Sequence, residues 1–145
     1  MTEPHHVDPD AYEISTDKSR LDLDRIAAFL ADSYWASKRP RDVIEKSIAA
    51  SLCFGAYRKT GGAQVGFARV ITDGATFGWV ADVYVDPECR GAGIGKALMQ
   101  AITETPELRG VRLLLVTRDA HRLYAQYGFE ALASPQDWMS RAAGG

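Results

Sequence analysis

The sequence predicts an α/β protein with one mixed sheet, in which an antiparallel meander leads into a parallel strand–helix–strand crossover. Three apolar runs, at residues 52–58, 64–71 and 76–85, follow one another with turn residues between them. A glycine-rich turn at 90–96 then leads into a helical pattern and a further apolar run at 111–116. A crossover of this kind is right-handed and makes its two strands parallel.

The length of 145 residues suits one domain. We expect that domain to span residues 11–145, after a polar leader at 1–10 that is mobile. A short first strand is expected at 12–15. Asp22 can cap the first helix, whose apolar face is expected to comprise Leu23, Ile26, Ala27, Leu30 and Tyr34. A second helix is expected from about residue 40 to residue 50, with an inner face of Val43, Ile44, Ser47 and Ile48.

The meander is expected to place Val65, Phe67 and Ile71 on one face of its middle strand. Turn residues at 59–62 and at 73–74 separate its strands. The helix after the glycine turn is expected to end before Pro106. Residues 111–116 are expected to form a buried strand.

A short helix is then predicted at 119–127, capped by Asp119 and ended by Gly128. A last strand is predicted at 129–132. Trp138 and Met139 are expected either to add an edge strand or to fold over the core.

Composition excludes several classes of protein. The net charge of −2 gives no general attraction to nucleic acid or to an anionic membrane. The two cysteines, Cys53 and Cys89, are too few for a disulfide framework or a set of zinc ligands. We therefore expect no metal and a reduced, cytoplasmic setting. His5 and His6, in a polar leader, are expected to be solvated. No apolar stretch approaches the length of a membrane span, and no signal peptide is recognisable.

The glycine-rich turn has the sequence Arg90-Gly91-Ala92-Gly93-Ile94-Gly95-Lys96. Such a turn at the start of a helix presents free N–H groups and a partial positive charge, which together bind phosphate. It is not a Walker loop, because Arg90 and Ala97 replace the required glycine and hydroxyl residue. It is not the dinucleotide fingerprint either, because Lys96 stands where the third glycine belongs.

The pattern Arg-x-x-Gly-x-Gly instead resembles the acetyl-CoA pyrophosphate loop of the GNAT-type N-acetyltransferases. A second segment, residues 120–129, is similar to that family's Ala-x-x-Leu-Tyr-x-x-x-Gly-Phe signature. The resemblance extends over residues 12–132. It implies the GNAT fold with splayed central strands, and acetyl-CoA as cosubstrate.

The resemblance also implies a set of binding residues. The pyrophosphate would bind the main-chain amides of Arg90, Gly91, Ala92, Gly93, Ile94, Gly95 and Lys96. The pantetheine arm would lie along Val83, Tyr84 and Val85, with the thioester carbonyl bound by an N–H near Val83 or Tyr84. An asparagine that contacts this arm in the family is replaced by Thr117, which offers only a hydroxyl.

Acyl transfer to an amine needs one group to take a proton and another to give one. Tyr124 matches the family tyrosine and is the expected acid, with Tyr127 as a weaker substitute; the alternative is that Tyr124 only packs. Asp82 is the expected base, directly or through water, because burial would raise its pKa. The alternatives are His121 as the base, or an Asp82 carboxylate satisfied by main-chain or arginine partners.

The expected activity is acetyl transfer to a primary amine by direct attack in a ternary complex. The acceptor pocket is expected between residues 35–41 and the last strands, with Tyr34, Trp35 and Trp138 as candidate aromatic walls. The basic residues of 38–41 either meet an acidic substrate or are solvated. A non-catalytic acyl-CoA sensor and a nucleotide-binding regulator are the rival interpretations. Homodimers are common in the family.

Overall fold

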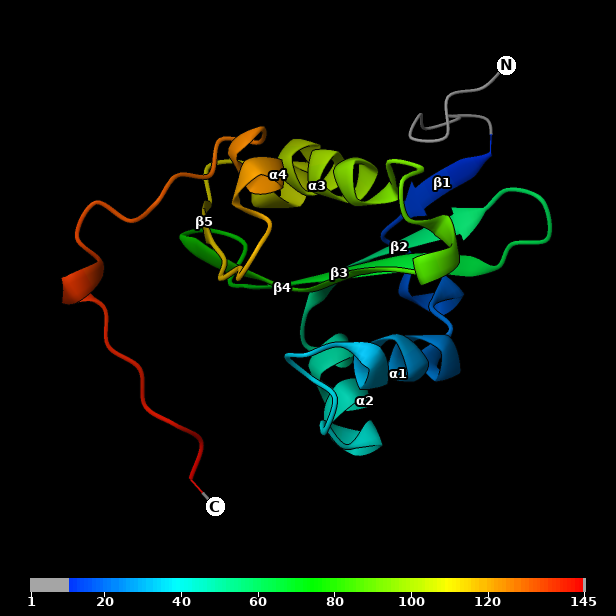
Figure 1. Ribbon diagram of the computed structural model, residues 1–145, viewed down its shortest axis with the longest axis horizontal. Coiled ribbons are helices and arrows are strands. Elements are labelled where there is room, and N and C mark those ends of the chain that lie inside the picture. Colours follow the sequence, from blue (N-terminus) through cyan, green and yellow to red (C-terminus); the bar gives the residue numbers. More distant parts are fainter. Residues whose placement is uncertain (1–10, 145) are drawn as a thin grey trace.

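The computed structural model describes residues 11–144, so the expected mobile leader lies outside the described residues. Figure 1 shows a central sheet with helices on both faces. The strands follow one another in space in the order β1-β2-β3-β4-β5. β1 to β4 are antiparallel, and β5 is parallel to β4. Their bounds are Tyr12–Ser15, Leu52–Arg58, Gln64–Thr72, Phe77–Val85 and Arg112–Leu114.

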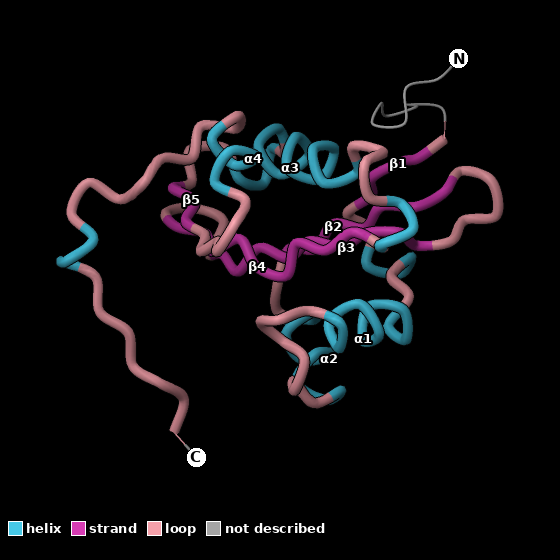
Figure 2. The backbone as a smooth tube through the Cα atoms, viewed as in Figure 1, coloured by secondary structure: helices cyan, strands magenta, loops and turns pink. Residues whose placement is uncertain are grey.

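Within the described part of the chain, four α-helices cover the sheet. α1 (Leu23–Asp32) and α2 (Arg41–Ala49) lie on one face. α3 (Ile94–Glu104) and α4 (His121–Ala125) lie on the other (Figure 2). Each face has its own apolar cluster, and because both sides are covered, the inner strands are apolar on both faces.

The start of α1 is confirmed, because the Asp22 side chain accepts a hydrogen bond from the Arg25 amide at 3.0 Å. Its predicted face is too long. The helix ends at Asp32, so Tyr34 lies beyond it and is 54% exposed. On α2, Ile44 and Ile48 are buried but Val43 is exposed, which corrects the expected inner face.

The expected face of β3 is also wrong, because a bulge interrupts the pairing. Ala56 pairs with Gly66 but Tyr57 pairs with Gln64, so Val65 is an extra residue. One extra residue reverses the side-chain alternation. Val65 therefore packs under α3, whereas Phe67 packs under α1 and α2. Ile71 lies near the end of the strand and is exposed.

The C-terminal elements are shorter than predicted. β5 ends at Leu114, and Val116 is 78% exposed. α4 begins at His121 without a side-chain cap, so the predicted cap by Asp119 is wrong.

Residues 129–132 form no strand, and β5 offers a neighbour only three residues to pair with. Trp138 and Met139 neither join the sheet nor cover the core. Phe129 still packs on the core, and the chain beyond it runs away from the body of the molecule (Figure 1). The guanidinium of Arg112, on β5, lies 5.4 Å from the centre of the Trp138 ring, and Met139 is 96% exposed.

Candidate active site

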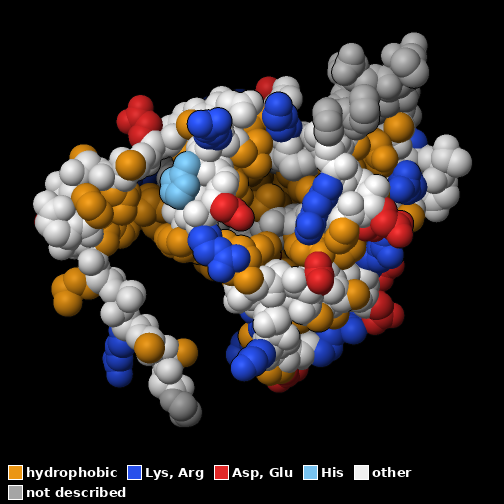
Figure 3. Space-filling view, viewed as in Figure 1, with side chains coloured by type: hydrophobic (Ala, Val, Ile, Leu, Met, Phe, Trp, Pro, Cys, Tyr) orange, Lys and Arg blue, Asp and Glu red, His pale blue; other side chains and the backbone are white. Residues whose placement is uncertain are grey.

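A cleft opens where β4 and β5 separate. Their pairing ends at Trp79 and Leu114, while β4 continues to Val85 with β3 as its one strand neighbour among the described residues. Just beyond that point β4 is bulged, since Arg69 pairs with Ala81 but Phe67 pairs with Tyr84. The bulge puts Asp82 in the left-handed region, at φ 56°. A cavity of about 1030 Å³ occupies the gap, and Figure 3 shows a hollow with apolar side chains inside it.

The glycine-rich turn forms one end of this cleft. Gly91 and Gly93 have φ of 88° and 81°, and Gly93 begins α3 in the left-handed conformation. Within residues 11–144, the amides of Gly91, Gly93 and Gly95 donate to no protein acceptor. The turn is held by other bonds, from the Ala92 amide to the Cys89 carbonyl at 3.2 Å and from the Ala97 amide to the Gly93 carbonyl at 3.0 Å. The free amides therefore belong to a turn that is already formed.

Two cations flank these amides. The Arg90 Nε donates to the Val85 carbonyl at 3.2 Å, and its guanidinium lies 5.3 Å from the centre of the Tyr84 ring. Lys96 is exposed in the first turn of α3. All residues expected to bind the cosubstrate line the cleft except Ala92, which packs against the core under α3.

Tyr124 lies on α4 and faces the same cleft. Its ring is half-buried and meets Phe129 edge-on at 6.0 Å. Burial raises the pKa of Tyr124, and nearby Tyr34 and Asp119 raise it further. Its phenol is therefore neutral around pH 7 and is able to donate a proton or a hydrogen bond.

The neighbours of Tyr124 have other contacts. The Tyr127 hydroxyl donates to the Lys96 carbonyl at 3.0 Å, which ties the end of α4 to α3. Thr117 lines the cleft, but its hydroxyl oxygen accepts from the Ala120 amide at 3.0 Å. His121 is exposed and is not among the residues that line the cleft.

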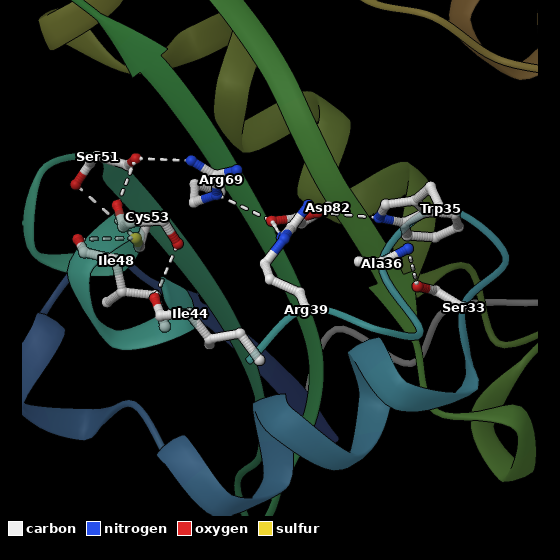
Figure 4. Close-up of polar contacts among 11 residues, drawn as sticks. Ser33, Trp35, Ala36, Arg39, Ile44, Ile48, Ser51, Cys53, Arg69 and Asp82 are labelled. Atoms are coloured by element: carbon white, nitrogen blue, oxygen red, sulfur yellow. Dashed lines mark hydrogen bonds and ion pairs between the residues drawn. The ribbon is translucent and has the colours of Figure 1, made fainter. Parts of the chain in front are cut away.

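Asp82 lies at the centre of a buried polar cluster (Figure 4). Its Oδ2 accepts from Arg39 Nη1 at 2.8 Å and from Arg69 Nε at 2.9 Å, and its Oδ1 accepts from Trp35 Nε1 at 2.9 Å. Arg69 is also fixed by a bond to Ser51 Oγ at 3.1 Å. This matches the alternative of a carboxylate satisfied by arginine partners.

The expected rise in the Asp82 pKa is wrong. Burial does raise this pKa, but the Arg69 hydrogen bond and the charges of Arg69 and Arg39 lower it more, so the net shift is downward. Both carboxylate oxygens already accept hydrogen bonds, and the side chain is only 1% exposed. Such a carboxylate is a weak and poorly accessible base.

Sequence reasoning did not identify Asp32, the last residue of α1. The Tyr84 hydroxyl donates to Asp32 Oδ2 at 2.5 Å, and both residues line the cleft. Burial and the bond to Asp32 raise the pKa of Tyr84 to about 12. The available signal was an acidic residue in the last turn of a predicted helix, where the helix dipole disfavours it.

Aromatic rings form the outer wall of this part of the cleft. The Tyr34 and Trp35 rings meet edge-on at 5.0 Å, and Trp35 lies 6.5 Å from Tyr84. The guanidinium of Arg118, from the segment after β5, lies 3.8 Å from the centre of the Tyr34 ring. Tyr34 and Trp35 therefore line the cleft as expected, whereas Trp138 does not.

Residues 11–144 contain no group of three or more His, Cys, Asp or Glu side chains that is arranged to hold a metal ion. None of the helices in that range has the length and apolar character needed to cross a membrane.

Comparison with known proteins identifies the class. The model of the acetyltransferase (GNAT) domain matches residues 49–131. A Gibberella zeae protein, named as an inferred acetyltransferase, is 36% identical over 148 residues, which cover 87% of this chain and 82% of the relative. The chain therefore belongs to the GNAT family of acetyltransferases, whose members use acetyl-CoA as cosubstrate.

Other relatives differ in length. A soybean protein named as a histone acetyltransferase is 31% identical over 138 residues, which cover 86% of this chain and 53% of the relative. The chain thus spans about half of that protein.

Solved structures confirm the fold. A crystal structure of a Xanthomonas campestris pv. campestris protein assigned to the GNAT family superposes with a TM-score of 0.86 and 46% identity, covering 91% of this chain and 93% of that one. The Neisseria gonorrhoeae N-acetylglutamate synthase, solved with coenzyme A and N-acetylglutamate, has a TM-score of 0.69 at 22% identity. That match covers 86% of this chain and 30% of that one, and supports the fold alone.

Proposed function

We propose that the protein transfers the acetyl group of acetyl-CoA to a primary amine by direct attack in a ternary complex. The observation that carries the proposal is the set of free amides at Gly91, Gly93 and Gly95, which open into a cleft that also contains Tyr124. A helix start with free N–H groups suits a diphosphate. The same cavity is lined by this turn and by Tyr124, so one bound ligand would contact both.

The cosubstrate would bind in three parts. Its pyrophosphate would accept hydrogen bonds from the glycine amides, with Arg90 and Lys96 adding positive charge. Its pantetheine arm would lie along Val83–Val85, where β4 has no neighbour on the side of β5. The thioester carbonyl would accept from a main-chain N–H near Val83 or Tyr84, which stabilises the negative charge that develops on its oxygen.

Tyr124 would act as the acid of the reaction. The lone pair of the neutral amine forms a bond to the thioester carbon, the C–S bond breaks, and the sulfur takes the Tyr124 proton, while the nitrogen loses a proton to a base or to solvent. The phenol then regains a proton from solvent. The neutral state that burial favours for Tyr124 suits this role.

Asp82 would serve better as a positioning residue than as the base. Its carboxylate holds Trp35 and Arg39, and so fixes the 33–40 segment that walls the acceptor side. The proposal keeps the cytoplasmic setting expected from the sequence, since Cys53 and Cys89 are both buried free thiols.

Tyr124→Phe tests this function. We expect kcat to fall by roughly 10²-fold or more, while calorimetry gives an acetyl-CoA Kd within about twofold of wild type. Tyr12→Phe, a hydroxyl loss on β1 away from the cleft, should leave both unchanged. Equal losses of turnover and affinity would contradict the acid role. Tight acetyl-CoA binding with no CoA release across an amine panel would favour a non-catalytic acyl-CoA sensor instead.

A further inference from the structure

The carboxylate of Asp32 lies at an unfavourable place for stability. It is the last residue of α1, where the helix dipole is negative and repels a carboxylate. Among residues 11–144, no Lys or Arg lies within ion-pair distance of it. The residue is exposed and lines the cleft. Among the described residues, the partner of its side chain is therefore the Tyr84 hydroxyl and not a cation.

The contact with Tyr84 fixes this carboxylate. The Tyr84 hydroxyl donates to Asp32 Oδ2 at 2.5 Å. Tyr84 itself is only 5% exposed and stacks on Phe29 at 5.0 Å between ring centres. Its phenol stays protonated over the physiological range, so it always acts as the donor. Asp32 is thus oriented by a rigid partner and retains a free oxygen.

The place where Asp32 is held matters for the reaction. Tyr84 lies on the part of β4 that has left β5, just after the bulge at Asp82. This is the segment expected to bind the thioester. Asp32, which is hydrogen-bonded to the Tyr84 side chain and lines the same cleft, would therefore face the region in which the thioester is expected.

The walls near Asp32 suit a cation. Tyr34 and Trp35 present exposed rings to the cleft, at 54% and 41% exposure. Aromatic faces attract ammonium and guanidinium groups. The Tyr34 ring already binds the guanidinium of Arg118, 3.8 Å from its centre, so Trp35 is the aromatic wall offered to an acceptor cation.

We propose that Asp32 binds the acceptor amine in its ammonium form and receives its proton, and that Tyr84 positions the Asp32 carboxylate. This inference rests on the proposed acetyl transfer and assigns the base to a residue other than Asp82. The two carboxylates differ in one decisive respect. Asp82 has donors on both oxygens, whereas Asp32 has one donor and a free oxygen.

The proton transfer follows the formation of the new bond. A free ammonium, with a pKa of about 10.4 for lysine, does not give its proton to a carboxylate of about 3.9. An ammonium has no lone pair, so the bound amine first loses one proton to solvent, and the small neutral fraction reacts. As the lone pair of this neutral amine bonds to the thioester carbon, the nitrogen becomes positively charged and much more acidic, and its second proton passes to the free Asp32 oxygen. The C–S bond then breaks, sulfur takes the Tyr124 proton, and Asp32 releases its proton to solvent.

The experiment compares wild type, Asp32→Asn, Tyr84→Phe and the control Asp24→Asn with acetyl-CoA and a set of amines. Asp24 lies on the same helix, with a side chain that is 90% exposed and paired only at the surface with Arg41. The cationic amines are phenethylamine, ethanolamine, spermidine and lysine. Aniline, which is uncharged near neutral pH, serves as the neutral amine. CoA release gives kcat and KM, and calorimetry gives the acetyl-CoA Kd.

Asp32→Asn should lower kcat/KM for the best cationic amine by roughly 10²-fold or more. It should leave the acetyl-CoA Kd within about twofold and should change the low aniline rate by less than about tenfold. Tyr84→Phe should lower kcat by roughly tenfold with little change in KM, because it leaves the Asp32 carboxylate in place but no longer fixes its orientation. Asp24→Asn should match wild type.

Three results would overturn the inference. The first is an Asp32→Asn variant with wild-type kcat/KM. The second is a variant whose acetyl-CoA affinity falls as far as its turnover. The third is a wild-type protein that acetylates aniline but none of the cationic amines. A wild-type protein that does not bind acetyl-CoA at all would instead overturn the proposed function.

Discussion

Asp82→Ala removes the carboxylate on which Arg39, Arg69 and Trp35 converge. Arg69 is 9% exposed in its side chain and Arg39 is 23% exposed, so neither cation regains full hydration. Removing one partner of a buried ion pair costs about 3–5 kcal/mol. For a domain of this size, about 3 °C of Tm is lost per kcal/mol. We therefore expect Tm to fall by roughly 10–15 °C.

Backbone strain separates two variants at this position. Asp82 has φ of 56°, which asparagine tolerates better than alanine. Asp82→Asn also keeps an oxygen that can accept from one arginine. It should therefore lose less stability than Asp82→Ala, by about 1–2 kcal/mol.

Urea unfolding followed by tryptophan fluorescence gives these free energies. Asp24→Ala, which breaks an exposed ion pair on α1, should change stability by less than about 1 kcal/mol. A cycle with Arg69→Met should show strong coupling, because the two side chains are in contact. An Asp82→Ala protein within about 1 kcal/mol of wild type would refute the view that this carboxylate holds the 33–40 segment.

Two further predictions concern the turn and the response to acid. Gly93→Ala should weaken CoA binding by tenfold or more and lower stability by about 1 kcal/mol. The control Gly110→Ala, with a similar φ of 77° but away from the cleft, should lose a comparable stability and no CoA affinity. Equal CoA affinities of the two variants in calorimetry would argue against the glycine turn as the CoA-binding site. The Asp82 pKa is lowered in the folded state, so its contribution to stability is present above the unfolded value of about 3.9 and is lost as pH falls below it. Asp82→Asn should flatten the pH dependence of the unfolding free energy in that range. Asp17, Asp73 and Glu107, whose pKa values are also lowered, remain in both proteins, so an unchanged slope would show that Asp82 does not cause the loss of stability in acid.

The glycine turn and the order of the helices and strands could be predicted from the sequence because they depend on local residue patterns. The position of Gly93 at the start of α3 follows from a pattern within a few residues. The separation of β4 from β5 was expected only from the resemblance to the GNAT family. The two bulges were not readable, because each depends on the register with a neighbouring strand. The error in the β3 face and the left-handed conformation of Asp82 both come from these bulges.

Long-range partners explain the remaining differences. Asp82 lies 43 residues from Arg39 and 47 from Trp35 in sequence, so their bonds were not deducible from spacing. The sign of the Asp82 pKa shift depends on those partners and was wrong for that reason. Asp32 and Tyr84 are 52 residues apart in the sequence, so their hydrogen bond could not be predicted. The one local signal for Asp32 was its position at the C-terminal end of a helix.

Amide chemical shifts of the ¹⁵N-labelled protein during titration with CoA test the central claim most directly. The account predicts that the Gly91, Gly93 and Gly95 amides shift strongly downfield and become protected from exchange, because a diphosphate accepts their hydrogen bonds. Binding that leaves these three resonances unchanged while others move, or no binding at millimolar CoA, would contradict it.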